Sequence, residues 1–252
     1  MNKQEARFDY VLRQADNCLI LGQRLGEWCG HGPVLEQDIA MTNIALDLIG
    51  QSRSLYQYAA ELDGQGKTED DLAYLRDAWQ FRNFLLLEQP NKDFAYTIAR
   101  QFYFDAFHYH FLKELTASSD DHLVAIATKS LKEATYHLKW SSDWVLRLGD
   151  GTDESHEKMQ NAVNDLWSYT GEFFEKNETD VILEKEGVGV DLTNVKTNWN
   201  KVVTDILAEA TLVQPETGWM QSGGKDGIHT EHLGFILADL QFLQRAYPGE
   251  KW

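Results

Sequence analysis

Residues 35–62 decide the fold class, and they read LEQDIAMTNIALDLIGQSRSLYQYAAEL. Apolar residues recur in this stretch at three- and four-residue spacing, which places them on one face of an α-helix. Helix-breaking strings bound it on both sides, at residues 30–33 (GHGP) and 63–66 (DGQG). The sequence therefore predicts one long amphipathic helix here. Its apolar stripe runs through Ile39, Ile44, Leu48, Leu55 and Leu62.

The same periodicity continues along most of the chain, which contains only four prolines. Thr68 and the acidic residues after it form a capping box that predicts a helix start. Residues 181–190 are short and glycine-broken, and they fit either a small turn of helix or an irregular arm. No run of alternating strands occurs, so we predict an all-α helical bundle with four long core helices and flanking shorter ones. Further helices are predicted over residues 8–28, 68–88, 93–116, 121–148, 154–176, 192–212 and 229–247.

Composition excludes several classes of protein. The chain has 252 residues, with 23 basic and 40 acidic side chains and a net charge of −17, which argues against nucleic-acid binding. No apolar run is long enough to span a membrane; residues 84–87, for example, are closed at once by Glu88. The first residues lack a secretory signal, so we expect a cytoplasmic protein. Cys18 and Cys29 lie on one predicted helix, about 16 Å apart, and are expected to be reduced and buried.

Long helices with acids and histidines raise the possibility of a di-iron carboxylate site, which uses Glu-x-x-His pairs. No such pair occurs in this chain. Asp105 and His108 have the right spacing with a shorter acid, and Glu133 and His137 are one residue too far apart. For each pair, a buried hydrogen-bonded couple is the commoner explanation.

The glycine-rich residues 218–227 resemble a phosphate loop only superficially. Asp226 follows Lys225 where a Walker loop needs Ser or Thr, and no strand precedes the loop. A flexible or partner-contacting loop is the preferred interpretation, and its role stays open.

Three segments, GEWCGHGP at residues 26–33, DLIGQ at 47–51 and GGKDGIHTEHLG at 223–234, resemble the C-subunit family of phenylacetyl-CoA epoxidases. These enzymes are bacterial multicomponent monooxygenases of aerobic phenylacetate degradation, and the similarity runs from residue 9 to residue 252. The resemblance implies one ferritin-like domain over residues 1–252. It also implies a stable complex with a related catalytic A subunit, which holds the di-iron site, and with the other epoxidase subunits. Self-association within the complex is expected too.

The resemblance also identifies where metal ligands are missing. The catalytic relative carries Asp-Glu-x-Gly-His on one core helix, where this chain has Leu48 and Gln51 in place of the ligand Glu and His. A later Glu-Glu-x-x-His becomes Glu133 to His137, with Ala134 in place of the ligand Glu and only His137 retained. Asp105 matches a remaining acid ligand, and residues 15–23 contain no Glu.

Charge then argues against a metal. Two ferrous ions bring four positive charges, which the one carboxylate of Asp105 and the imidazole of His137 cannot balance in an interior. Gln51, Asp105, His108 and His137 are expected to hydrogen-bond instead. We therefore predict no metal, no cofactor and no catalytic residue in this chain.

The resulting hypothesis is a structural, non-catalytic subunit, with Trp28 and Lys225 as candidate partner contacts. Two alternatives remain open: an autonomous di-iron oxidase that uses Asp105, His108 and His137, and a helical module that binds coenzyme A thioesters.

Overall fold

The computed structural model describes residues 1–216 and 218–250. These residues form α-helices and short 3-10 helices and contain no β-strand, so the predicted all-α class is confirmed. No helix among them is long and apolar enough to cross a membrane. The end of the predicted domain, at residues 251–252, lies outside the described residues.

The chain divides into two compact units. The terminal unit comprises Met1–Pro90 and Gly223–Trp252, and the central unit comprises Asn91–Ser222. Each unit contains two of the four long helices that the sequence predicts. A single domain over residues 1–252 stays a prediction.

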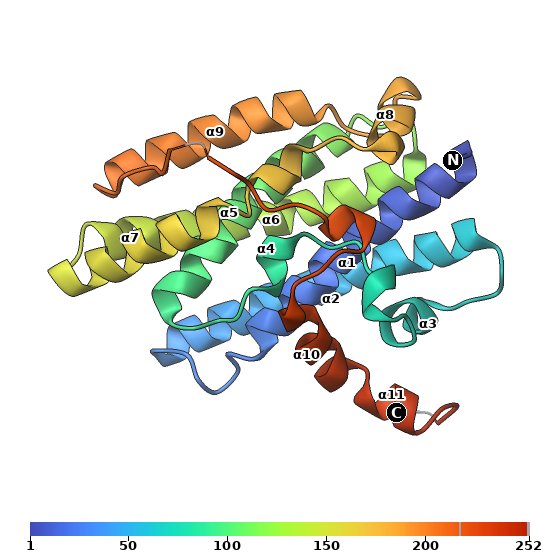
Figure 1. Cartoon of the computed structure of the whole chain (residues 1–252), viewed down its shortest axis with the longest axis horizontal. Helices are drawn as coiled ribbons and strands as arrows, with labels where there is room; N and C mark the ends of the chain where they lie inside the picture. The colour runs from blue at the N-terminus through green and yellow to red at the C-terminus, as the bar shows by residue number, and fades with distance from the viewer. Residues whose placement is uncertain (217, 251–252) are drawn as a thin grey trace. The chain divides into compact units, whose positions relative to one another are not determined.

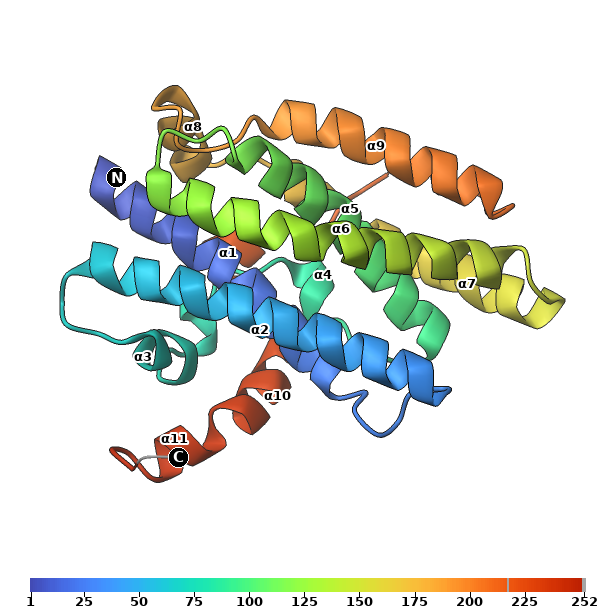
Figure 2. The ribbon, with the colours of Figure 1, turned by 180° about the vertical axis from the view of Figure 1, so that it is seen from behind.

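The terminal unit is built on an antiparallel pair of long helices, α1 (Lys3–Gly26) and α2 (Leu35–Asp63), which lie side by side in Figures 1 and 2. The Ser52 hydroxyl on α2 donates to the carbonyl of Ala15 at 3.0 Å, and Gln4 near the start of α1 donates to the carbonyl of Leu62 at 3.0 Å. The helix α2 ends at Gly64, whose φ of 64° is left-handed and suits glycine. The stretch that opened the sequence analysis is thus one helix, as predicted.

Residues 68–88 do not form the single helix that the sequence predicted. The capping box at Thr68 is present, but it begins only the six-residue helix α3 (Glu69–Tyr74). A 3-10 turn η1 (Ala78–Gln80) and one turn of helix α4 (Leu85–Glu88) follow. Two side chains of α1 accept hydrogen bonds from the backbone between η1 and α4. Asp16 accepts the N–H of Arg82 at 2.8 Å, and Asn17 accepts the N–H of Phe84 at 2.9 Å, so neither N–H group serves a continuous helix.

Asp16 is the centre of a buried ion-pair network. It is fully buried, and its carboxylate receives four hydrogen bonds. The guanidinium of Arg76 donates two, the hydroxyl of Tyr56 donates one, and the N–H of Arg82 donates the fourth. Arg76 is also buried and lies over the ring of Phe81 at 4.1 Å. The network therefore ties α1, α2 and residues 76–82 together without an unpaired charge.

The chain returns to the terminal unit at its C-terminal end. A 3-10 turn η3 (Gly224–Asp226) precedes α10 (Glu231–Leu240) and α11 (Phe242–Ala246). The predicted helix over residues 229–247 is wrong in one respect, because it breaks at Gln241. The buried side chain of Gln241 donates to the carbonyls of Ala73 and Arg76 at 3.1 and 3.0 Å, which fixes the chain at this point.

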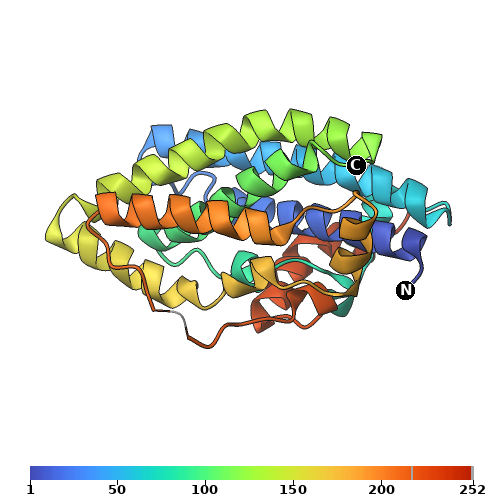
Figure 3. The same cartoon turned by 90° about the horizontal axis from the view of Figure 1, so that it is seen from above.

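The central unit packs its helices around α5. It consists of α5 (Phe94–Leu115), α6 (Asp121–Gly149), α7 (Asp153–Trp167), a 3-10 turn η2 (Gly171–Phe174), α8 (Glu178–Lys185) and α9 (Leu192–Glu209). Seventeen residues of α5 are buried, and α6, α7 and α9 pack against it (Figures 1 and 3). The indole of Trp199 on α9 donates to the carbonyl of Tyr103 at 2.9 Å and lies 5.8 Å from the ring of Trp167.

Two predicted segments of the central unit are corrected or resolved. The helix over residues 154–176 ends at Trp167 instead, and a Cβ on Gly171 would lie 2.7 Å from Met220, so the chain turns where only glycine fits. The ambiguous residues 181–190 contain most of the short helix α8, followed by a turn at Gly187 with a φ of 70°.

The two cysteines are thiols, as predicted. Cys18 is buried on α1, but Cys29 lies on the surface, so its predicted burial is wrong. Cys29 follows the last turn of α1, where the chain has already left the helix pair.

We expect Asp16→Ala to lower the free energy of unfolding by about 3–5 kcal/mol, because Arg76 stays buried after its partner anion is removed. Urea denaturation of the full chain measures this. The control is Lys139→Ala, which removes an exposed ion pair with Asp143 and should cost less than about 1 kcal/mol. Equal losses in the two variants would contradict the assigned role of Asp16.

Candidate functional site

The predicted ligand positions of the terminal unit both lie on α2. Leu48 is fully buried and offers no donor atom to a metal. Gln51 is buried one turn further along, and its Oε1 accepts the thiol of Cys18 at 3.8 Å. No Glu faces them from residues 15–23 of α1. At the two expected ligand positions, this unit therefore has the apolar side chain of Leu48 and the amide of Gln51, whose oxygen already accepts a hydrogen bond from Cys18.

The central unit contains the other predicted positions. Asp105 and His108 are buried on α5, and Ala134 and His137 are buried on α6. The four share one interior region, since α5 and α6 pack together and the charge of His137 acts on His108. Here Ala134 supplies only a methyl group at the position where the resemblance implies a ligand Glu in the catalytic relatives.

The carboxyl of Asp105 is held in its neutral form. Burial raises its pKa to about 8, although hydrogen bonds from Ser141 and Gln101 favour the charged form. Gln101 donates to Oδ1 at 2.7 Å, whereas Oδ2 is buried without a hydrogen-bond partner among the described residues. No cationic side chain contributes to this pKa. Asp105 is therefore largely protonated at neutral pH.

His108 is neutral as well. Burial, together with the nearby His137, lowers its pKa to about 3. Its ring stacks on Phe104 with the centroids 5.0 Å apart. At neutral pH, Asp105 thus carries no carboxylate charge and His108 no imidazolium charge.

These residues do not fit a di-iron centre. Among residues 1–216 and 218–250, no group of three or more His, Cys, Asp and Glu side chains is arranged to hold a metal ion. The central unit offers one protonated carboxyl and two imidazoles, and Leu48 and Ala134 offer nothing. A pair of divalent ions needs about four compensating negative charges in an interior, and this donor set falls far short.

In the glycine-rich loop, the charged side chain of Lys225 is buried rather than exposed. Lys225 is buried, and its ammonium group lies 5.6 Å from the ring centre of Phe84. A Cβ on Gly227 would meet the carbonyl of Trp79 at 2.3 Å, so the loop closes tightly on that turn. Lys225 is therefore not the surface contact that the sequence suggested, whereas Trp28 is half-buried.

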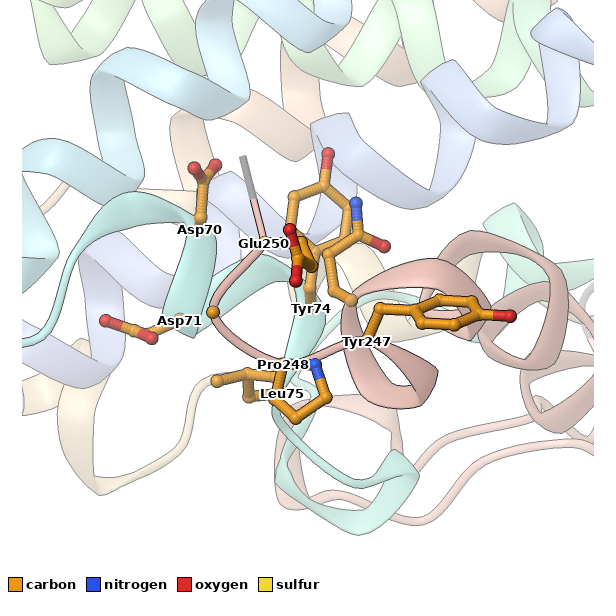
Figure 4. A pocket seen from close by; sticks show the side chains of 9 residues that line it. Asp70, Asp71, Tyr74, Leu75, Tyr247, Pro248 and Glu250 are labelled. Atoms are coloured by element: carbon orange, nitrogen blue, oxygen red, sulfur yellow. The ribbon is translucent and has the colours of Figure 1, made fainter. Parts of the chain in front are cut away.

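An acidic cavity of about 630 Å³ lies in the terminal unit, between α3 and residues 247–250 (Figure 4). Asp70, Asp71 and Glu250 line it together with Tyr74 and Tyr247. Its carboxylates would repel the phosphates of a coenzyme A thioester, and none of the predicted site residues reaches it.

Sequence reasoning missed one buried polar cluster in the terminal unit. Glu88 is fully buried at the end of α4, and His229 and Thr230 bind its carboxylate. The quoted motif GIHTEHLG contains both of these residues, but their partner lies 141 positions away along the chain, so no local pattern points to it.

Comparison with known proteins gives consistent results. Residues 1–252 match the family model described as "Phenylacetic acid catabolic protein". A protein of Escherichia coli (strain K12), named as the C subunit of 1,2-phenylacetyl-CoA epoxidase, is 52% identical over 243 residues, or 96% of this chain and 98% of its own length. A solved structure from Synechococcus, "Protein 19 with aldehyde deformylating oxidase activity", superposes with a TM-score of 0.59. The superposition covers 84% of this chain and 95% of the Synechococcus chain, at 11% sequence identity. A likeness at this identity concerns the fold alone, and it confirms the ferritin-like bundle.

The raised pKa of Asp105 predicts that the stability of the folded chain depends on pH. This raised pKa means that the folded chain keeps a proton between about pH 4 and about pH 8 that the unfolded chain releases, so Asp105 lowers stability as the pH rises. The slope reaches about 1.4 kcal/mol per pH unit for one proton. We expect Asp105→Asn to gain stability over the wild type progressively from about pH 5 to about pH 8, as measured by urea denaturation. The exposed Asp205→Asn is the matched control, and parallel curves for wild type and Asp105→Asn would contradict the assignment.

Proposed function

Because the chain belongs to the phenylacetic acid catabolic protein family, as its motifs predicted, we propose that it is the non-catalytic, structural subunit of a 1,2-phenylacetyl-CoA epoxidase. Its role is to support the fold and assembly of a related catalytic A subunit that holds the di-iron site. The observation that carries the proposal is the loss of ligand chemistry at Leu48 and Ala134, in a chain whose curated relative is named a subunit of that enzyme.

The interior of the central unit supports a structural role. A catalytic di-iron site needs ionised carboxylates that stay available to metal and oxygen, whereas Asp105 retains its proton and His108 stacks on Phe104. These residues fill and hydrogen-bond the interior. The chain then contributes to epoxidation through its outer surface, in the cytoplasm, with the other epoxidase subunits as partners.

The first test concerns the metal. The purified full chain, loaded anaerobically with ferrous iron and then desalted, should retain no stoichiometric iron in elemental analysis, because the donor set is too small and too weakly charged. About two irons per chain would contradict the proposal and favour an autonomous di-iron oxidase.

The second test concerns the complex. Co-expression with the catalytic subunit should yield a stable complex, and omission of this chain should leave the catalytic subunit poorly soluble or inactive. Phenylacetyl-CoA epoxidation by the reconstituted components, with and without this chain, measures the effect. Full turnover in its absence, by an unchanged and stable catalytic subunit, would disprove the structural role.

A further inference from the structure

The carboxylate of Glu88 is saturated with hydrogen-bond donors. Asn83 donates to Oε1 at 3.0 Å, and Thr230 donates to Oε2 through its backbone N–H at 2.8 Å and its hydroxyl at 2.6 Å. The ring of His229 contacts Oε1 at 2.6 Å. Four donors on two oxygens are the complement that suits an ionised carboxylate, which only accepts hydrogen bonds.

His229 lies between two acceptors. Its Nδ1 faces Oε1 of Glu88 at 2.6 Å, and its Nε2 faces the carbonyl oxygen of Phe81 at 2.9 Å. A neutral imidazole carries one N–H, so it can satisfy only one of these contacts and turns a lone pair toward the other acceptor. Only the imidazolium donates to both. The side chains of His229 and Glu88 are only 5% and 0% exposed, so water does not readily replace a lost contact.

We propose that His229 is a proton-operated clasp: as an imidazolium it fastens the C-terminal arm, residues 228–250, to Glu88 and Phe81, and its deprotonation loosens the arm. His229 lies just before α10, one residue ahead of the N-cap residue Thr230. The clasp is independent of the vestigial ligand positions and of the proposed subunit role.

The arm depends on this fastening because it buries little of its own surface. The ten-residue helix α10 buries only Leu233, Ile236 and Leu237, and α11 buries no residue. Helices this short are marginal without tertiary contacts. Ile228 and Phe235 are both 67% exposed, so the outer face of the arm adds no packing. Gln241 anchors the far end, which leaves residues 228–240 as the part that the clasp controls.

Charged groups on every neighbouring element act on the imidazolium. Glu88 on α4 contacts it directly, and Asp16 on α1 adds a second negative charge. Two arginines oppose them: Arg82 donates to the same carbonyl of Phe81 at 2.8 Å, and Arg24 on α1 donates to the backbone carbonyl of Glu88. Asp9 and Glu27 pair with these two arginines, at 3.5 and 2.9 Å. Other charged or titratable groups on the same elements are Arg76, which Asp16 neutralises, Lys225 and Asp226 on η3, and Glu231 and His232 on α10 itself.

The balance of these groups favours the charged ring. Burial lowers the pKa of His229, but the hydrogen bond and charge of Glu88, the carbonyl of Phe81 and the charge of Asp16 outweigh it, so the pKa lies above its ordinary value. A raised folded pKa means that the contribution of the clasp is complete below about pH 6.5 and is lost as the pH rises through the folded value. The arm is therefore fully fastened below about pH 6.5 and loosens as the pH rises from there through the folded pKa.

Hydrogen–deuterium exchange of the full chain between about pH 6 and about pH 9, corrected for intrinsic exchange, tests the clasp. Protection of residues 228–240 should fall by up to tenfold per pH unit between about pH 6.5 and the folded pKa, where the closed arm holds a proton that the open arm has released, and should level off at higher pH. Protection of α6 in the central unit should stay level. An arm whose protection does not change with pH, or changes only in step with α6, would overturn the proposal.

Variants separate the clasp from other titrations. His229→Gln keeps one donor without a titratable proton, so the arm should show low protection at every pH. His232→Gln, three residues further along the chain, is the matched control and should retain the wild-type pH dependence. Persistent pH dependence in His229→Gln, or its loss in the control, would contradict the role of His229.

A direct measurement needs no variant. Nitrogen-15 NMR of the wild-type histidines should find both ring nitrogens of His229 protonated at about pH 6.5, with a titration midpoint above that of a free histidine. A neutral ring at that pH would overturn the proposal even if the variants fail to fold.

Discussion

The terminal unit depends on the buried carboxylate of Asp16. A carboxylate without solvent must gather donors, and this one takes the guanidinium of Arg76, the hydroxyl of Tyr56 and the N–H of Arg82. Taking that N–H prevents a helix from running through residues 76–84. The resulting path turns the carbonyl of Phe81 toward His229, and α4 ends with Glu88 beside the same ring. One acid on α1 thus helps to position the groups that His229 contacts.

In the central unit, the buried acid Asp105 is neutralised by a proton, whereas Asp16 is neutralised by a guanidinium group. Asp105 has no cation beside it and keeps a proton, while His108 gives its proton up. The neutral forms of these two residues cost less than uncompensated ions in low dielectric. In the catalytic relatives, as the family resemblance implies, metal ions balance the acids of the corresponding helices. In the proposed structural subunit, protonation and substitution by Leu48 and Ala134 achieve neutrality without metal.

The sequence was sufficient for features that are local. The spacing of apolar residues predicted α2 almost to the residue, and α5 and α6 within one or two positions, because long amphipathic helices carry their own signal. The helix predicted over residues 68–88 failed because Asp16 and Asn17, more than sixty positions away, compete for its N–H groups. The degenerate ligand positions stay a prediction from the motifs. The burial of these five residues, Leu48, Gln51, Asp105, Ala134 and His137, is visible only in three dimensions. The pairing of Glu88 with His229 left no trace in the sequence pattern at all.

The order of segments along the chain has a consequence for how the protein is made. The central unit is continuous, but the terminal unit is split, and 141 positions separate Glu88 from the His229 that binds it. At a synthesis rate of about 5–20 residues per second, the ribosome needs about 7–28 s to travel that distance. During this interval, α1, α2 and α4 exist without the arm, and the whole of the central unit emerges. The central unit can therefore complete its native contacts during translation, whereas the terminal unit can close only after residues 223–250 have been synthesised.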